Sequence, residues 1–244
     1  LDRWVKSLPS QFSNSEMLLA QPILEDLEER IHRLLEVGVG YLTLDRSSPS
    51  LSAGESQRLR LASLLGSGLT GVLYVLDEPS IGLHQRDTQR LIKVLKKLRD
   101  LGNTVLVVEH DLELIREADY IVDIGPKAGK GGGRIVAAGT PEEVADNAES
   151  ITGAFLANRK IVPAPQKRRR SHGKELKIYG AQQHNLRDLT VSFPLGVLTV
   201  VTGVSGSGKS SLVFDILDKA ARQRFNHASD EPGLHTSISG WQHL

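Results

Sequence analysis

The feature that most constrains the fold is a glycine-rich stretch, Gly203-Val-Ser-Gly-Ser-Gly208-Lys209-Ser210. It follows an apolar run at 198–202, which is typical of a buried strand, and it precedes a helical pattern at 210–219. In a loop between a strand and a helix, backbone N–H groups converge at the helix N-terminus, where an anion is favoured. The spacing G-x-x-x-x-G-K-S therefore predicts a polyphosphate-binding loop in an α/β protein.

This loop, which we call the P-loop, gives each polar side chain an expected role. Lys209 would reach the β- and γ-phosphates of a nucleotide, and the Ser210 hydroxyl would hold Mg²⁺. An ordinary glycine turn is the alternative, but it leaves the lysine and serine at these offsets unexplained. We expect nucleotide contacts from Gly203, Ser205, Gly206, Ser207, Gly208, Lys209, Ser210 and Ser211.

Acidic residues follow two further apolar runs, 72–76 and 104–108, which both read as buried strands. Asp77 and Glu78 follow the first run. We expect Asp77 to bind Mg²⁺ and Glu78 to activate a water molecule as a general base. His110 follows the second run, from where it could hydrogen-bond a γ-phosphate. The alternatives are a solvated acidic turn and a structural histidine.

A third motif lies upstream, at Leu51-Ser52-Ala-Gly54-Glu-Ser-Gln57. A serine hydroxyl and a glycine amide at the start of a helix form an anion site, and we expect Ser52, Gly54 and Gln57 to contact a nucleotide. A simple helix cap is the alternative. Strands and helices alternate along the chain, which predicts an α/β parallel sheet with flanking helices. Helices are expected at 22–37, 56–65 and 88–99, and further strands at 120–124, 134–138, 175–179 and 189–193.

These three motifs together resemble the ABC ATPase superfamily, whose P-loop fold includes a helical signature subdomain. In that superfamily the P-loop precedes the signature and the acids, whereas here it follows them. The order predicts the end of one nucleotide-binding domain at 1–157, a linker at 158–174, and the start of a second domain at 175–244. A circularly permuted single domain is the alternative. Leu1 is not a Met, so we expect an internal piece of a longer chain.

The sequence segments around the motifs narrow the resemblance to one family within this superfamily. Leu76-Asp-Glu-Pro-Ser-Ile-Gly-Leu-His-Gln-Arg-Asp87, His184-Asn185-Leu186 and Val201-Thr-Gly-Val-Ser-Gly-Ser-Gly-Lys-Ser-Ser-Leu212 closely resemble the UvrA family of excinuclease proteins, which act in nucleotide-excision repair. The resemblance implies a cytoplasmic ATPase that uses ATP and Mg²⁺, dimerises, surveys duplex DNA for damage and loads the helicase-like excinuclease protein UvrB. The zinc modules of the family would lie outside this sequence.

The resemblance also assigns residues to sites. Ser52 and Gly54 would approach the nucleotide held by Lys209 and Ser210, whereas Glu78 and His110 would serve a P-loop outside this sequence. Ala53 departs from the family, which usually has glycine there. This methyl group is expected to weaken or alter ATP coupling, and it raises the alternative of a divergent relative that serves drug resistance.

Composition excludes several classes of protein. The chain has no cysteine, so it can form neither disulfides nor cysteine-ligated zinc sites. Its formal net charge is +1, so no global basic field points to nucleic acid, although a local basic patch would suffice for nucleic-acid binding. No apolar run is long enough to span a membrane, and we expect no membrane partner, although a transport ATPase remains an alternative. Another alternative is that the chain is a nucleotide-binding fragment without activity of its own.

Two polar segments are open to more than one interpretation. Lys167 to Arg170 form a basic run, which either lies solvated in a linker or touches phosphates. His227, His235 and His243 lie in the polar tail, where we expect surface histidines and no metal site.

Overall fold

The computed structural model describes residues 1–244 apart from the side chain of Ala53, so the predicted effect of that methyl group lies outside the described residues. The chain divides into two compact units, Leu1–Val162 and Pro163–Leu244. In the first unit the elements are α1 Asp2–Ser7, η1 Leu8–Gln11, α2 Asn14–Glu36, η2 Ser48–Ser50, α3 Ala53–Leu65, β1 Leu73–Asp77, α4 Gln85–Asp100, β2 Thr104–Val108, α5 Leu112–Arg116, β3 Ile121–Gly125, η3 Gly129–Gly131, β4 Arg134–Gly139, α6 Pro141–Asp146 and α7 Ile151–Leu156.

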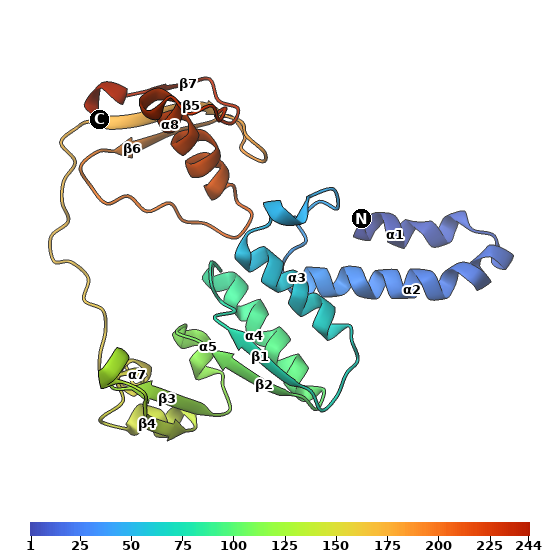
Figure 1. The fold of residues 1–244 in the computed structure, drawn as a ribbon. Coiled ribbons are helices and arrows are strands. Elements are labelled where there is room, and N and C mark those ends of the chain that lie inside the picture. The colour runs from blue at the N-terminus through green and yellow to red at the C-terminus, as the bar shows by residue number, and fades with distance from the viewer. The chain divides into compact units, whose positions relative to one another are not determined.

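The core of the first unit forms where α4 covers β1 and β2 (Figure 1). Leu91, Leu95 and Leu98 of α4 recur at helical spacing and are all buried. The end of α2 and one side of α3 join the same cluster through Val37 and Leu61. This packing fixes the signature helix α3 against the layer that carries the predicted catalytic residues.

Strands β1 and β2 pair in parallel, with Leu73 opposite Thr104 and Asp77 opposite Val108. The register brings both carboxyl ends to one edge of the sheet. The prediction that these strands are buried is correct for only one face of the pair. Leu73 and Val75 are 60% and 62% exposed, because the described residues cover only one face of this two-stranded sheet.

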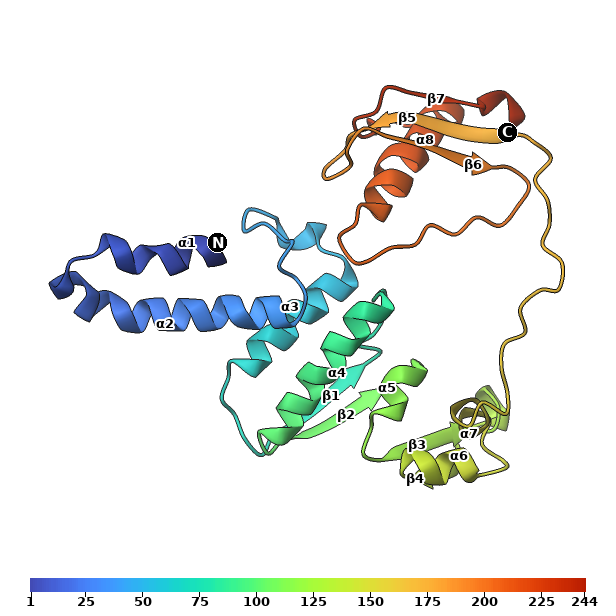
Figure 2. The ribbon, with the colours of Figure 1, turned by 180° about the vertical axis from the view of Figure 1, so that it is seen from behind.

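Helix α2 is longer than the predicted helix at 22–37. It begins at Asn14 because Ser13 and Glu16 form a capping box, in which each side chain accepts a hydrogen bond from the other residue's backbone N–H. Figures 1 and 2 both show α1 beside α2, and buried Val5 packs with Leu24. The apolar side chains of this helix are not all buried, since Ile23 is 69% exposed.

The remaining strands of the first unit pair differently from the prediction. Strands β3 and β4 form an antiparallel pair, so the parallel arrangement is confirmed only for β1 and β2. A short connection of eight residues, 126–133, joins β3 to β4, and antiparallel strands need no crossover helix. Helices α6 and α7 pack on this pair through Ala137, Val144 and Leu156.

The second unit is built on an antiparallel sheet with strand order β6-β5-β7. Ile178, Leu212 and Ile216 form its core with neighbouring apolar side chains. The tail, from which little was expected, adds a strand to this sheet and packs Trp241 against Phe225. The elements are β5 Glu175–Ala181, β6 Leu189–Pro194, the π-helix η4 Ser211–Asp218, α8 Lys219–Asn226, β7 Ser237–Ser239 and η5 Trp241–His243.

Two predictions around the P-loop need correction. Residues 198–202 form no strand, and Leu198 and Val200 are 93% and 74% exposed. A buried parallel strand needs partners on its edges, and no described strand of this unit pairs with these residues. The helix expected at 210–219 is a π-helix at Ser211–Asp218 that continues as α8 to Asn226. In the part of the chain that the structure describes, every helix is too short or too polar to cross a membrane.

Candidate functional site

Glu78 and His110 lie together at the carboxyl edge of the parallel pair. The His110 Nε2 atom is 2.9 Å from Glu78 Oε1. Glu78 has a positive φ of 43°, which turns the chain sharply as it leaves β1. Their side chains are 43% and 76% exposed, so both remain accessible to water and to a ligand. A histidine that orients a carboxylate in this way is suited to proton transfer from water.

Asp77 is the last residue of β1 and directly precedes Glu78. Its carboxylate is a hard oxygen donor, and so is the Ser210 hydroxyl in the second unit; Mg²⁺ prefers such donors when it takes its other ligands from phosphates and water. Each residue therefore has donor chemistry that fits a Mg²⁺ ion at its own nucleotide. Within the described residues, no three histidine, aspartate or glutamate side chains come together as a protein-only metal site.

Glu109 is a residue of the candidate site that the sequence did not single out. Its Oε1 atom accepts a hydrogen bond from the Ser80 backbone N–H at 2.8 Å, and Oε2 accepts from those of His110 at 2.8 Å and Asp111 at 3.2 Å. One carboxylate thus ties the loop after β1 to the loop after β2. Burial alone would raise the pKa of Glu109, but hydrogen bonds from Ser80, His110 and Asp111 lower it below its ordinary value.

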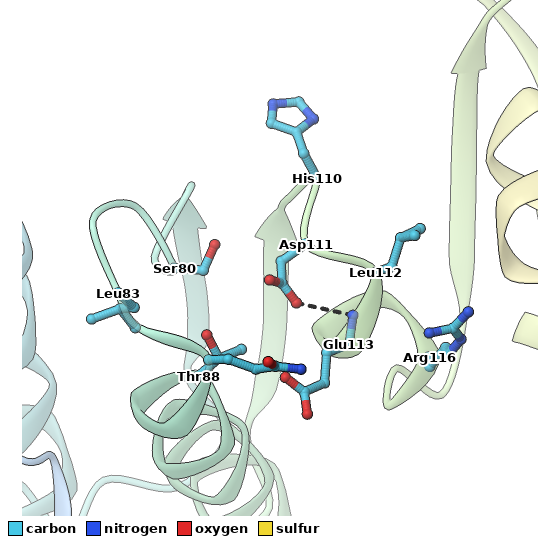
Figure 3. A pocket seen from close by; sticks show the side chains of 9 residues that line it. Ser80, Leu83, Thr88, His110, Asp111, Leu112, Glu113 and Arg116 are labelled. Carbon is cyan, nitrogen blue, oxygen red and sulfur yellow. Dashed lines mark hydrogen bonds between the residues drawn. The ribbon is translucent and has the colours of Figure 1, made fainter. Parts of the chain in front are cut away.

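A cavity of about 450 Å³ opens beside these two loops (Figure 3). Ser80, Thr88 and Arg116 contribute to its lining, and the His110 side chain points away from them. Asp111 also lines the cavity, but its Oδ1 atom accepts from the Glu113 backbone N–H at 2.9 Å and so caps α5. Asp111 therefore has a structural task, which leaves Glu78 as the carboxylate paired with His110.

The signature motif forms a capped helix start. Ser52 Oγ accepts from the Glu55 backbone N–H at 3.2 Å, and Glu55 Oε2 accepts from the Ser52 backbone N–H at 2.8 Å. The predicted helix cap is therefore present, and the Ser52 side chain also hydrogen-bonds the Glu55 carboxylate, so a ligand would compete with Glu55 for the hydroxyl proton. Gly54 packs closely on the loop after β1, since a Cβ atom there would lie 3.1 Å from the Ile81 carbonyl oxygen. Gln57 is partly exposed on the same helix.

A polar network around the buried Glu55 carboxylate holds this helix start in place. Tyr41 donates its hydroxyl to Glu55 Oε1 at 2.7 Å, and Arg46 lies 3.6 Å from the other oxygen. Burial, together with the hydrogen bond to Glu55, raises the pKa of Tyr41 to about 12. Burial would raise the pKa of Glu55, but hydrogen bonds from Ser52 and Tyr41 and the charge of Arg46 lower it. Glu55 therefore stays ionised and fixes the signature serine.

In the second unit, the P-loop is folded around its own lysine. Lys209 Nζ donates to the carbonyl oxygens of Gly203 at 2.7 Å and Val204 at 3.0 Å. Gly206 and Gly208 have positive φ angles of 74° and 99°, which side-chain-bearing residues rarely adopt. The ammonium group thus uses loop carbonyls as partners at the position where phosphate oxygens would compete for it.

Asn185 is a second residue that the sequence did not single out as part of the site. Its Nδ2 group donates to the Gly206 carbonyl oxygen at 3.0 Å. A Cβ atom on Gly208 would lie 2.9 Å from Asn185 Oδ1 and 2.7 Å from Leu186 Cδ2. The turn before β6 therefore braces the P-loop from outside. The segment His184-Asn185-Leu186 contributed to the family resemblance, but the sequence did not predict the contact between Asn185 and the P-loop.

The P-loop, the capped signature helix and the Glu78–His110 pair define the class: an α/β P-loop NTPase of the ABC type. A solved structure, "Crystal structure of UvrA2 from Deinococcus radiodurans", has the same fold with a TM-score of 0.85 and 46% identity, over 95% of this chain and 27% of that chain. The predicted fold class is confirmed.

Sequence relatives identify the family. The chain is 55% identical to UvrABC system protein A of Streptococcus pneumoniae over 232 residues, which are 95% of this chain and 25% of the relative. It is also 55% identical to UvrABC system protein A of Methanothermobacter thermautotrophicus over 234 residues, 96% of this chain and 24% of the relative. No protein-family model matches the chain. The chain belongs to the UvrABC system protein A family and spans about a quarter of the length of these relatives.

Proposed function

We propose that this chain is the part of an ATP-hydrolysing nucleotide-excision-repair protein that joins two nucleotide-binding domains. The observation that carries the proposal is the 55% identity to UvrABC system protein A over 95% of the chain. The domain division is proposed as 1–157, 158–174 and 175–244. The exposed segment around Pro163, where the chain passes from one compact unit to the other, supports a linker there.

The residues of the site take the following roles in the proposal. Lys209 and the P-loop amides bind the phosphates of ATP, while Ser210 and Asp77 hold Mg²⁺, each for the nucleotide that it serves. Glu78 accepts the proton of the attacking water, and His110 orients Glu78 and the γ-phosphate. Mg²⁺, when bound, neutralises charge on the phosphates. The same nucleotide contacts are proposed for the remaining P-loop and signature residues, Gly203, Ser205, Gly206, Ser207, Gly208, Ser211, Ser52, Gly54 and Gln57.

Partners follow from the family. The relatives are named as components of a UvrABC system, and this supports damaged duplex DNA and UvrB as partners of the full-length protein. A homodimer and a location in the cytoplasm belong to the same proposal.

The test is a loading assay with the full-length protein, purified UvrB, ATP and a duplex that carries one bulky lesion. We expect UvrB to be retained on the damaged duplex in the presence of hydrolysable ATP, and much less on an undamaged duplex of the same sequence. Retention of UvrB that depends on neither the lesion nor ATP would contradict the repair function. It would favour a relative that has kept the fold and changed its task.

A further inference from the structure

Positive charge in this chain is concentrated in one short segment, residues 158–174, which we call the basic linker. It contains seven of the 30 basic residues of the chain and none of its 29 acidic residues. The rest of the chain is therefore net acidic, although the whole carries only +1. A segment with this bias attracts anions even where the molecule as a whole does not.

The charges of the basic linker are exposed and unneutralised. Every residue from 157 to 175 is exposed to solvent. None of the seven basic side chains forms an ion pair with a carboxylate within the described residues. Arg159 and Arg169 donate only to neutral carbonyl oxygens, and Lys160 lies over the ring of Phe155. The segment thus holds cations that folding leaves without an anionic partner.

The arrangement of these cations suits a line of phosphates better than a single anionic group. Lys167 to Arg170 are adjacent in a segment with no helix or strand, and all four are exposed to solvent. They spread four charges over at most about 13 Å of chain. Duplex DNA presents roughly eight phosphate charges along the same length. Adjacent cations on an extended chain can each meet a phosphate without a defined fold.

We infer that the basic linker contacts the phosphate backbone of duplex DNA independently of base sequence, with Lys167–Arg170 as its main contact. This inference rests on the proposed function, because it takes DNA as the polyanion. It assigns to the linker a binding task separate from the nucleotide site. Neutralising the four side chains should weaken DNA binding and its salt dependence, and leave nucleotide binding unchanged.

The experiment measures the affinity of the full-length protein for an undamaged duplex between 50 and 200 mM salt, a range over which about six to ten phosphate contacts change affinity by orders of magnitude. In K167Q/R168Q/R169Q/R170Q the slope of log affinity against log salt should fall by about three to four units, at about 0.9 per lost phosphate contact. In R168K/R169K/R170K the charge is kept, so the slope should stay at the wild-type value.

A matched control removes four exposed basic residues elsewhere, in R3Q/K127Q/K130Q/R134Q. Its slope should equal that of the wild type. A normal slope in the linker variant, or an equal loss in the control, would overturn the inference and leave the repair function standing. Tighter binding of the linker to anionic lipid vesicles than to the duplex would also overturn it. Failure of the wild-type protein to bind the duplex would instead contradict the proposed function.

Discussion

The two units hold the loops of the candidate site in opposite ways. In the first unit the loops after β1 and β2 are tied by a carboxylate, Glu109, which accepts hydrogen bonds from three backbone N–H groups. In the second unit the P-loop is closed by a cation, Lys209, which donates to two of the loop's carbonyl oxygens. A side chain supplies the anion in one place and the cation in the other.

The difference teaches which half of the chemistry depends on a ligand. Glu109 accepts hydrogen bonds from backbone amides beside Glu78 and His110 in the absence of nucleotide, so we expect this pair to be positioned before any nucleotide binds. Lys209 is bound only to neutral carbonyl groups, and the phosphates of ATP offer it stronger, charge-assisted partners. The first site is therefore preformed, whereas the second is expected to reorganise around its ligand.

The largest effect is expected from Glu78→Gln in the full-length protein with its second nucleotide site silenced. The amide keeps the shape of the side chain and removes its basicity, so ATP turnover should fall on the order of a hundredfold or more. Nucleotide affinity should survive. Steady-state hydrolysis and a nucleotide titration measure the two quantities, and Glu142→Gln, an exposed glutamate, is the matched control. Normal turnover in Glu78→Gln would show that another group activates the water.

Next in size is the effect of Lys209→Ala on nucleotide binding. Loss of a charged hydrogen bond to phosphate costs about 1.5–3 kcal/mol, so affinity at the second site should fall roughly 10- to 150-fold. Titration with a fluorescent ATP analogue, with the first site silenced, measures it. Lys219→Ala, on the helix that follows, should bind as the wild type does. Unchanged affinity in Lys209→Ala would break the assignment of this loop to phosphate.

Glu109→Ala tests the carboxylate that ties the two loops. With the tie removed, Glu78 and His110 lose their fixed geometry, and we expect turnover to fall about tenfold at constant KM, since an unmet backbone donor costs about 1–3 kcal/mol. Glu109→Gln keeps one carbonyl acceptor and should recover part of the loss. A rise in KM with unchanged turnover would show that Glu109 serves binding instead.

The same residue predicts a pH dependence. The pKa of Glu109 lies below its ordinary value of 4.5, so the folded state favours the ionised form. Its contribution to the free energy of unfolding is therefore fully present above pH 4.5 and is lost as the pH falls through the lowered pKa. Denaturant unfolding of wild type and Glu109→Gln should give a constant difference at neutral pH, and that difference should shrink in acid. A difference that grows in acid would contradict the assignment.

The smallest effect is expected from Asn185→Leu, which removes the donor to the Gly206 carbonyl and keeps the size of the side chain. A neutral hydrogen bond contributes about 0.5–1.5 kcal/mol, so nucleotide affinity should fall roughly two- to tenfold. Gln182→Leu is the control, because Gln182 hydrogen-bonds Asp188 and not the P-loop. Equal effects of the two substitutions would place Asn185 in the general packing of the turn.

The sequence predicts the parts of the site that depend on local order. The spacing from Gly203 to Ser210 is enough to predict a loop before a helix, and adjacent strand ends are enough to place Glu78 near His110. The sequence does not predict contacts that depend on strand register or on the fold of a turn. Glu109 meets Ser80 only because β1 and β2 pair as they do, and Asn185 meets Gly206 only through the fold of the turn before β6.

Burial was the least predictable property. Apolar runs at 72–76 and 198–202 look alike in the sequence, yet the first forms a strand with one covered face and the second forms no strand. An apolar run indicates only that a segment can be buried. Whether it is buried depends on partner strands that lie elsewhere in the chain.

Residue-resolved hydrogen exchange of the backbone amides, without nucleotide and with ATP and Mg²⁺, tests the central comparison most directly. The amides of Ser80 and His110 should already be protected in the nucleotide-free full-length protein and should lose protection in Glu109→Ala. Those of Gly208 and Lys209 should gain at least about tenfold protection when nucleotide binds, which corresponds to about 1.4 kcal/mol. P-loop amides that are unchanged by nucleotide, or Ser80 and His110 amides that exchange rapidly until it binds, would contradict the account.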